Sequence, residues 1–354
     1  MYLCPEEDLE AISDGMKLDL EKLRNKKIFL TGATGFIGKN LVECLLWINE
    51  KNSLNIEILA ISRDCEKFYR NYPHFKKHTQ FKLYQSDVCD NLCNLPIKRI
   101  DFVIHAATDV LQQFDPMQIL RTSLDGTSNV LSYSIELGCE RFLLLSSGAV
   151  YGKSPNANVK FSESYIGGAD LVSPKSAYAL GKQLSEWLTQ QVSSLSIKVK
   201  IARCFAFVGP YLPLNQHFAI GNFIEASLQG HTIEIRGDGT PLRTYMYTSD
   251  LCICLLKILL SDNSNNVFNV GGDEVVSIRK LANIVKDTLN SDVCINIHQV
   301  NNKTIDSYIP DINRIKQALH VIPKINLRDA IRKTADWNLR YENIKQRAVK
   351  KYSN

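Results

Sequence analysis

Three side chains in the middle of the chain have the types and the order needed to interconvert a carbinol and a ketone. Tyr178 and Lys182 are four residues apart in a segment that opens with a proline and is predicted to be helical, so they lie on one helical face. A nearby ammonium lowers the pKa of a phenol, which lets the phenol exchange a proton near neutral pH. Ser147 directly follows an apolar, strand-like segment, and its hydroxyl can bind the same substrate oxygen. The three groups indicate catalysis with hydride transfer to or from a nicotinamide.

A glycine-rich segment near the N-terminus fits the second reactant in such a transfer. The sequence TGATGFIG, residues 31–38, follows a predicted strand directly and opens a predicted helix. Gly32 allows a tight turn, Gly35 lets the backbone approach a pyrophosphate, and Gly38 lets helix and strand pack closely. The helix N-terminus then offers free N–H groups to the anion. We expect a dinucleotide to bind Gly32, Thr34, Gly35, Phe36, Ile37 and Gly38.

The residue types at the end of the second predicted strand indicate whether NAD or NADP is bound. An acidic residue there would bind the ribose hydroxyls of NAD, but this strand ends in Ser62 and Arg63. A hydroxyl and a guanidinium suit the 2′-phosphate of NADP. We therefore expect NADP(H) to be favoured over NAD(H). The alternative is that Arg63 is only a surface residue and that Asp64 binds the ribose.

The first 208 residues alternate short apolar strands with amphipathic helices. Strands rich in Ile, Val and Leu with crossover helices between them suit a parallel sheet that is covered on both faces. The pattern predicts an α/β fold with a Rossmann-type, doubly wound parallel sheet. Strands are predicted over 27–31, 56–62, 81–84, 101–105, 141–146 and 198–203, and helices over 36–49, 116–137 and 174–193.

After residue 208 the alternation breaks at Gly209-Pro210 and Pro213. Residues 237–239 predict a turn between strands at 232–235 and 243–247, and helices are predicted over 250–260, 277–289 and 327–338. We interpret this part as a smaller α+β substrate lobe interleaved with the core. The predicted organisation is an N-terminal extension (1–25), an NAD(P)-binding domain (26–208), a substrate lobe (209–341) and a basic tail (342–354).

The composition argues against several other classes of protein. The chain has 354 residues, 45 % of them apolar, and a net charge of only +5 that is spread out, so we expect no nucleic-acid partner. The acidic segment 1–20 is not a secretory signal, and no run is long enough to cross a membrane. Ten cysteines lie without metal-ligand spacing. We expect a cytoplasmic protein with free thiols and no bound metal.

These motifs occur in an order that resembles the extended short-chain dehydrogenases, the NAD(P)-dependent epimerase/dehydratase family that modifies nucleotide-linked sugars. The resemblance runs from about Lys26 to Trp337. It implies that Asp87 and Val88 contact the adenine, that Ala106, Ala107 and Thr108 line the cofactor, and that Ser123 stands in place of a usual cofactor-binding Asn. It further implies that Tyr178 is the acid/base, that Lys182 binds the nicotinamide ribose and that Ser147 binds the sugar oxygen. For the substrate's nucleotide, it implies that Arg243 binds the pyrophosphate and that His217 helps to hold the nucleotide. The alternative for His217 is a surface histidine without this role.

The departures from the family pattern reduce the number of reactions that we expect of this chain. Gly148 and Ala149 stand where the family's 4,6-dehydratases have acids and its decarboxylases keep a carboxylate. Ala206 replaces a substrate-binding Asn. Pro310-Asp311 is preceded by Ser307, Tyr308 and Ile309 rather than by the family's second phosphate-binding Arg, so the substrate is expected to be held differently.

We therefore expect an NDP-sugar oxidoreductase, either a 4-ketoreductase or a 4-epimerase, with the NADP-type strand end favouring the reductase. The alternatives are a 4,6-dehydratase or decarboxylase of the same family, or a non-catalytic dinucleotide-binding protein. The resemblance also implies a homodimer formed through the helices at 116–137 and 174–193. Surplus apolar residues there fit a second contact: Leu120, Leu124, Val130, Leu131, Leu184, Trp187 and Leu188.

Overall fold

A seven-stranded parallel sheet forms the centre of the molecule. The computed structural model describes residues 2–108, 115–155, 159–194, 197–216, 218–298 and 306–352. The strands lie in the order β11-β6-β5-β4-β1-β2-β3. Successive strands are added to one side of β1 and then to the other, as in a doubly wound fold, which confirms the predicted fold class. The strands are β1 (Lys27–Thr31), β2 (Glu57–Ser62), β3 (Phe81–Gln85), β4 (Phe102–His105), β5 (Arg141–Ser147), β6 (Lys198–Cys204) and β11 (Val267–Val270).

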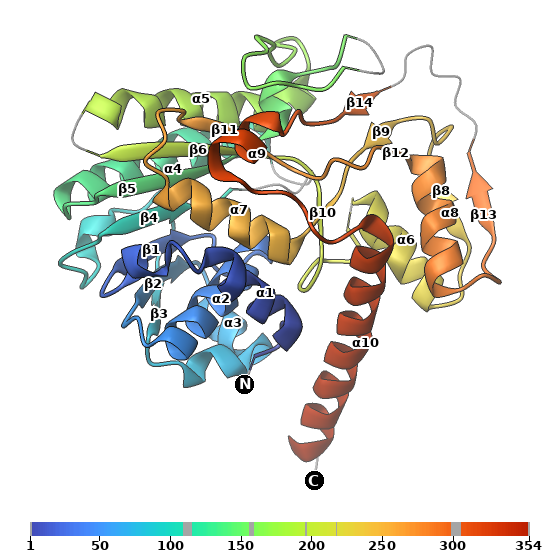
Figure 1. Cartoon of the computed structure of the whole chain (residues 1–354), viewed down its shortest axis with the longest axis horizontal. Coiled ribbons are helices and arrows are strands. Elements are labelled where there is room, and N and C mark those ends of the chain that lie inside the picture. The colour runs from blue at the N-terminus through green and yellow to red at the C-terminus, as the bar shows by residue number, and fades with distance from the viewer. Residues whose placement is uncertain are drawn as a thin grey trace.

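Helices cover both faces of this sheet (Figure 1). Alternate side chains of β1 divide between the two layers, because successive strand residues point to opposite faces. Phe29 packs toward α4 (Pro116–Glu136) and α5 (Ala177–Gln191), whereas Ile28 and Leu30 pack toward α2 (Phe36–Asn52) and α7 (Thr248–Leu260).

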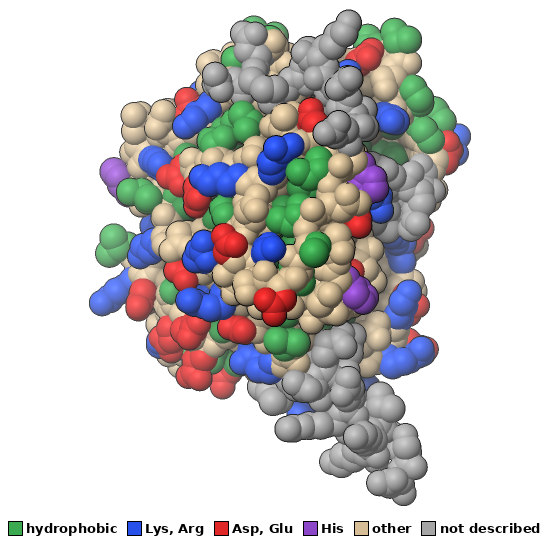
Figure 2. Space-filling view, turned by 90° about the vertical axis from the view of Figure 1, so that its right-hand side faces the viewer, with side chains coloured by type: hydrophobic (Ala, Val, Ile, Leu, Met, Phe, Trp, Pro, Cys, Tyr) green, Lys and Arg blue, Asp and Glu red, His purple; other side chains and the backbone are tan. Residues whose placement is uncertain are grey.

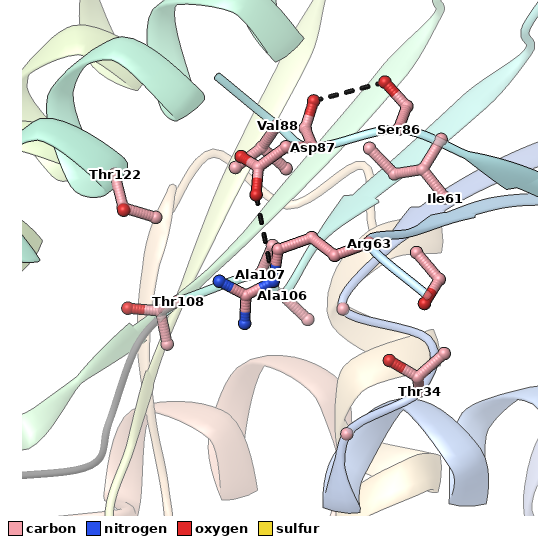
Figure 3. Close-up of a pocket in the computed structure, with 13 residues that line it drawn as sticks. Thr34, Ile61, Arg63, Ser86, Asp87, Val88, Ala106, Ala107, Thr108 and Thr122 are labelled. Carbon is pink, nitrogen blue, oxygen red and sulfur yellow. Dashed lines mark hydrogen bonds and ion pairs between the residues drawn. The ribbon is translucent and has the colours of Figure 1, made fainter. Parts of the chain in front are cut away.

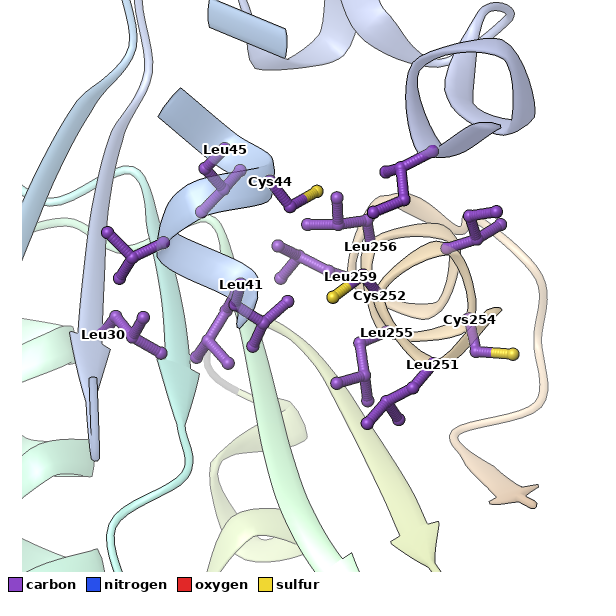
Figure 4. Close-up of a cluster of buried hydrophobic side chains, with 14 of the residues drawn as sticks. Leu30, Leu41, Cys44, Leu45, Leu251, Cys252, Cys254, Leu255, Leu256 and Leu259 are labelled. Carbon is purple, nitrogen blue, oxygen red and sulfur yellow. The ribbon is translucent and has the colours of Figure 1, made fainter. Parts of the chain in front are cut away.

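The layer on the α2 side is a dense apolar core (Figure 4). Leu41 and Leu45 of α2 meet Leu255 and Leu259 of α7 there, all fully or almost fully buried. Because α7 belongs by sequence to the predicted substrate lobe, the two parts of the chain share one core. All ten cysteines, including several in this core, are free thiols.

The N-terminal segment is part of this core. Helix α1 (Glu6–Met16) buries Leu9, Ile12 and Met16 against α7 and α2. The carboxylate of Glu43, which is fully buried, accepts hydrogen bonds from the backbone N–H groups of Leu3 and Cys4. The residues predicted as an extension therefore pack as an additional helix of the α2 layer.

The smaller lobe has a separate apolar core. Strand β8 (Ile233–Ile235) pairs with β13 (Ile295–Ile297), and β10 (Met246–Tyr247) pairs with β7 (Phe207–Val208). Strand β9 (Leu242–Arg243) lies between β12 (Val276–Ser277) and β14 (Ser307–Tyr308). The expected strand at 243–247 is thus wrong as one element, since its two ends pair with different partners. The remaining helices are α3 (Cys65–Asn71), α6 (Ala219–Leu228), α8 (Ile278–Leu289), α9 (Asn313–Leu319) and α10 (Leu327–Tyr352).

Helix α10 continues beyond the predicted end at residue 338 and runs through most of the segment expected to be a tail. On the face of the smaller lobe, Lys and Arg side chains lie among acidic and apolar ones (Figure 2). None of the helices in the described part of the chain is long and apolar enough to span a bilayer.

Candidate active site

The glycine-rich turn between β1 and α2 has no room for side chains. Gly32 has φ +71°, and a Cβ there would lie 2.7 Å from the carbonyl carbon of Ala106. A Cβ on Gly38 would lie 2.1 Å from the carbonyl oxygen of Gly32. Gly35 is the residue that caps α2, so the helix begins where the turn ends. The backbone thus presents the N-terminus of α2 at the carboxyl edge of the sheet, as the sequence predicted.

A pocket opens beside this turn (Figure 3). It combines backbone at a helix N-terminus, a strand-end cation and small side chains, which fits a dinucleotide. Ten of the expected cofactor residues line it: Gly32, Thr34, Gly35, Ser62, Arg63, Asp87, Val88, Ala106, Ala107 and Thr108. Phe36, Ile37 and Gly38 form the first turn of α2 behind it. Ile61, Ser86 and Thr122 also line the pocket and were not predicted.

The expectation for Ser123 is not met. Ser123 is buried, its hydroxyl donates to the carbonyl of Ile119 one turn earlier, and it faces Gly181 of α5. Thr122, the preceding residue on α4, forms the pocket wall instead. The family's Asn position is here a close contact between α4 and α5.

The strand-end residues expected to select the cofactor lie on the pocket wall. The guanidinium of Arg63 lies 3.8 Å from the carboxylate of Asp87, and the two side chains face each other in the pocket (Figure 3). The carboxylate of Asp64 instead accepts a hydrogen bond of 2.8 Å from the N–H of Lys67 and caps α3. One carboxylate oxygen of Asp64 is therefore already used by the cap, and ribose binding by Asp64 would fall to the other oxygen.

Buried hydrogen bonds connect β1 with α4 beneath the pocket. The hydroxyl of Thr31 accepts from the N–H groups of Ala106 and Ala107 and lies 2.7 Å from Nδ1 of His105. Nε2 of His105 lies 3.2 Å from the hydroxyl of Thr127 on α4. Burial lowers the pKa of His105 to about 3, so the ring is neutral and bridges β1 to α4.

The expected reaction centre gathers at the carboxyl end of β5. Ser147 is the last residue of this strand and its hydroxyl caps the following 3₁₀ turn through the N–H of Ala149, at 3.2 Å. Tyr178 stands in the first turn of α5 and is half-buried. A hydrogen bond with Ser147 favours the phenolate, but burial outweighs it and raises the pKa of Tyr178 to about 12.

Lys182 is buried one turn further along α5, and its ammonium donates to the carbonyl of Leu145 at 2.8 Å. Burial lowers the pKa of Lys182 to about 8. The expected lowering of the Tyr178 pKa is therefore wrong for this arrangement, because desolvation dominates and the ammonium is directed at a backbone oxygen. Tyr178 is protonated near neutral pH and is set to act as an acid.

A third hydroxyl, unforeseen from the sequence, completes the centre. Tyr308 of β14 places its hydroxyl 3.3 Å from that of Ser147 and donates to the carbonyl of Cys204 at 3.4 Å. Its ring packs on Phe205, with centroids 4.6 Å apart. Tyr308 lies at the reaction centre because β14 pairs with β9, where Tyr308 is opposite Arg243.

Gly148 is closed in by the same two rings. A Cβ on Gly148 would lie 2.7 Å from the Phe205 ring and 2.8 Å from the Tyr308 hydroxyl. The first of the two positions expected to carry acids in a dehydratase therefore has no room for a side chain unless these rings shift. This geometry agrees with the sequence-based argument against that chemistry.

Of the two residues expected to bind the substrate's nucleotide, Arg243 and His217, only Arg243 is among the described residues. Arg243 is one-quarter exposed and binds Asp306, with 2.6 Å between guanidinium nitrogen and carboxylate oxygen. The guanidinium lies 5.8 Å from the centre of the Tyr308 ring, so the expected pyrophosphate contact borders the reaction centre. His217 lies outside the described residues.

Comparison with known proteins relates the chain to a sequence family. Residues 28–271 match the sequence model of the NAD dependent epimerase/dehydratase family. UDP-glucuronic acid decarboxylase 3 of Arabidopsis thaliana is 30 % identical over 310 residues, 87 % of each chain. UDP-glucuronic acid decarboxylase 1 of Xenopus tropicalis is 28 % identical over 316 residues, 89 % of this chain and 72 % of the relative.

Solved structures share the fold. An epimerase of Methanothermobacter thermautotrophicus superposes with a TM-score of 0.77 at 22 % identity, covering 95 % of this chain and 97 % of the other. The UDP-glucuronic acid 4-epimerase of Bacillus cereus in complex with NAD gives a TM-score of 0.74 at 23 % identity, covering 88 % and 96 %.

Proposed function

Because the chain belongs to the NAD dependent epimerase/dehydratase family, we propose that it is an NAD(P)-dependent enzyme that interconverts carbinol and ketone at C4 of a nucleotide-linked sugar. The observation that carries this proposal is the reaction centre itself. It brings Ser147 and Tyr178 together, and it has Gly148 and Ala149 at the positions where the resemblance implies acids for the other reactions of the family. Proton exchange at one sugar oxygen is the chemistry that these groups support.

In this proposal, Tyr178 exchanges the proton of the sugar oxygen and Ser147 binds the same oxygen. The protonated phenol of Tyr178 donates as the ketone is reduced and must be deprotonated for the reverse direction. The bound nicotinamide cofactor supplies or takes up the hydride. Lys182, fixed to Leu145, would bind the ribose of that cofactor.

The similarity to UDP-glucuronic acid decarboxylases makes loss of carbon dioxide the natural competing proposal. We favour oxidoreduction because neither Gly148 nor Ala149 carries the carboxylate that the resemblance implies for decarboxylation, and a side chain on residue 148 would collide with Phe205 and Tyr308. A non-catalytic dinucleotide-binding role is disfavoured by the convergence of Ser147 and Tyr178 beside a cofactor-sized pocket.

A nucleotide diphosphate sugar is the proposed substrate class, with Arg243 at its pyrophosphate as a charge-assisted contact. Asp306 occupies Arg243 in the described structure, so the diphosphate would compete with this carboxylate. Two solved relatives, a UDP-glucose 4-epimerase of Thermotoga maritima and the UDP-glucuronic acid 4-epimerase of Bacillus cereus, hold UDP-glucose and UDP-glucuronic acid.

For the cofactor we retain the NADP(H) preference as a proposal. It is supported by Arg63 on the pocket wall and by the engagement of Asp64 as a helix cap. Two solved relatives, the UDP-glucuronic acid 4-epimerase of Bacillus cereus and a dTDP-glucose 4,6-dehydratase of Streptomyces venezuelae, hold NAD, so this chain would differ from them. A preference for NADPH favours the 4-ketoreductase, and tightly held NAD favours the 4-epimerase.

A homodimer through α4 and α5 is proposed as the assembly. Val130 and Leu131, expected among the surplus apolar residues, are buried in the core, whereas Leu124, Leu184 and Trp187 are exposed. The exposed fraction of Trp187 is 62 %, large for such a side chain. Sedimentation at micromolar concentration tests this, and a monomer would contradict it.

The function is tested by mass spectrometry of the copurified cofactor followed by incubation with a panel of nucleotide sugars and 4-keto-6-deoxy nucleotide sugars. The proposal expects C4 epimers or C4 alcohols as products. A cofactor-free protein that converts no member of the panel would contradict it.

A further inference from the structure

The hydroxyl of Tyr308 is a polar group in the reaction centre that the proposed chemistry does not use. It lies 3.3 Å from the hydroxyl of Ser147, which also has a hydrogen bond with Tyr178. Its other contact is the carbonyl of Cys204, at the longer distance of 3.4 Å. A substrate oxygen bound by Ser147 and Tyr178 would therefore have the Tyr308 hydroxyl within reach.

The ring of Tyr308 forms part of an apolar wall, with the Ser147 hydroxyl and the Arg243 guanidinium at its borders. Its ring packs on Phe205, and these two rings close the space above the Cα of Gly148. This part of the wall offers an aromatic surface and a single hydroxyl. Such a surface suits a neutral group of a sugar ring better than a second charged one.

Among the described residues, the cations near Tyr308 are already engaged. The guanidinium of Arg243 binds Asp306 at 2.6 Å, and the ammonium of Lys182 binds the carbonyl of Leu145 at 2.8 Å. Burial raises the pKa of Tyr308 above its ordinary value, so its phenol is neutral at physiological pH. A sugar carboxylate placed here would lose its water without gaining a full positive charge in exchange, which is costly.

We propose that Tyr308 is a specificity-determining residue whose hydroxyl binds a hydroxyl of the substrate sugar and that, through it, the enzyme selects uncharged sugars over uronic acids. This inference rests on the proposed function and names the sugar class. It separates the chain from its curated relatives, whose names specify UDP-glucuronic acid.

The test compares two probes that differ at C6, UDP-glucose and UDP-glucuronic acid, with UDP alone as the reference. Calorimetry uses the full chain loaded with reduced nicotinamide cofactor, so that the sugar carbinol is not oxidised. For the wild type we expect UDP-glucose to bind at least about tenfold more tightly than UDP-glucuronic acid.

Two variants assign this preference to Tyr308. Tyr308→Phe is expected to weaken UDP-glucose about three- to tenfold, the loss of one neutral hydrogen bond, while the affinity for UDP is unchanged. Tyr308→Arg is expected to shift the ratio of affinities toward UDP-glucuronic acid by at least about tenfold. Tyr69→Phe, on the surface helix α3, is the matched control and should leave all three affinities unchanged.

The outcomes separate the two claims. Equal binding of both sugars by the wild type, or a Tyr308→Phe variant with unaltered affinities, overturns the selection by Tyr308 and leaves the proposed function standing, since nucleotide sugars are still bound. Failure of the wild type to bind UDP or either sugar, together with no turnover of the wider panel, overturns the proposed function itself.

Discussion

The hydroxyl of Ser147 lies 3.3 Å from the hydroxyl of Tyr308, although 160 residues separate the two in the chain. Ser147 ends a strand of the parallel sheet, and Tyr308 ends a two-residue strand of the smaller lobe. The reaction centre is therefore assembled by docking of the lobe onto the sheet. The predictions for Tyr178 and Gly148 concern groups at this junction.

Replacement of Tyr178 by Phe removes the phenol that exchanges the proton and keeps the packing of the ring. We expect turnover to fall by at least about 10²-fold, the range for a general acid–base group, with little change in cofactor affinity. Steady-state kinetics and a cofactor titration measure the two effects. Turnover close to that of the wild type would mean that another group carries the proton.

The pH dependence should differ between the two directions of the reaction. With a pKa of about 12, the phenol of Tyr178 is protonated at neutral pH, so ketone reduction has its acid in place and should not depend on this group there. Sugar oxidation needs the phenolate, whose fraction grows about tenfold per pH unit below the pKa, so its rate should rise with pH. Initial rates in both directions over a pH series measure this, and a reduction rate that climbs as steeply as the oxidation rate would refute it.

Gly148→Ala should be costly despite being a small change. Its Cβ would lie 2.7 Å from the Phe205 ring and 2.8 Å from the Tyr308 hydroxyl, so the rings must move. We expect a loss of about 1–3 kcal/mol in the free energy of unfolding, typical of overpacking, and reduced activity. Gly237→Ala is the matched control, because nothing lies within 4 Å of a Cβ there. Denaturant titrations that give both variants wild-type stability would show that the space is open.

The choice of cofactor rests on Arg63. A charge-assisted contact with the 2′-phosphate is worth roughly 1.5–3 kcal/mol, or about a tenfold to hundredfold preference for NADPH over NADH. Arg63→Ala should erode this preference, and Ser62→Asp should reverse it by repelling the phosphate. Calorimetric titration of both cofactors against the three proteins decides. A wild type that prefers NADH, or an unchanged ratio in Arg63→Ala, would make Arg63 a surface residue and bring the epimerase to the fore.

Much of the fold follows from local patterns in the sequence. The strand–turn–helix at Gly32–Gly38 and the helix with Tyr178 and Lys182 stand where they were predicted, because apolar periodicity and glycine positions encode local structure. Strand β11 was not predicted: its four residues alone do not differ from a loop segment, and pairing with β6 makes them a strand.

The unforeseen parts depend on contacts between distant segments. Tyr308 enters the site through the pairing of β14 with β9, for which the sequence has no local signal. The acidic N-terminal segment looks solvated, yet Asp8 is buried and accepts hydrogen bonds from Tyr247 and Lys333. Burial also decides the pKa of Tyr178, which spacing to Lys182 alone cannot show.

The most direct test of the central claim is the mass of the product. The holoenzyme is incubated with UDP-glucose, UDP-glucuronic acid and 4-keto-6-deoxy nucleotide sugars, with reduced or oxidised cofactor, and the products are weighed by mass spectrometry. Oxidoreduction at C4 predicts that UDP-glucose and the 4-keto-6-deoxy sugars give products that keep every carbon and oxygen of the substrate, either isomeric with it or different by two hydrogens. A product of UDP-glucose lighter by water, or turnover of UDP-glucuronic acid to a nucleotide-linked pentose whose C4 is again a carbinol, would contradict the account, since these are the reactions of a dehydratase and of a decarboxylase.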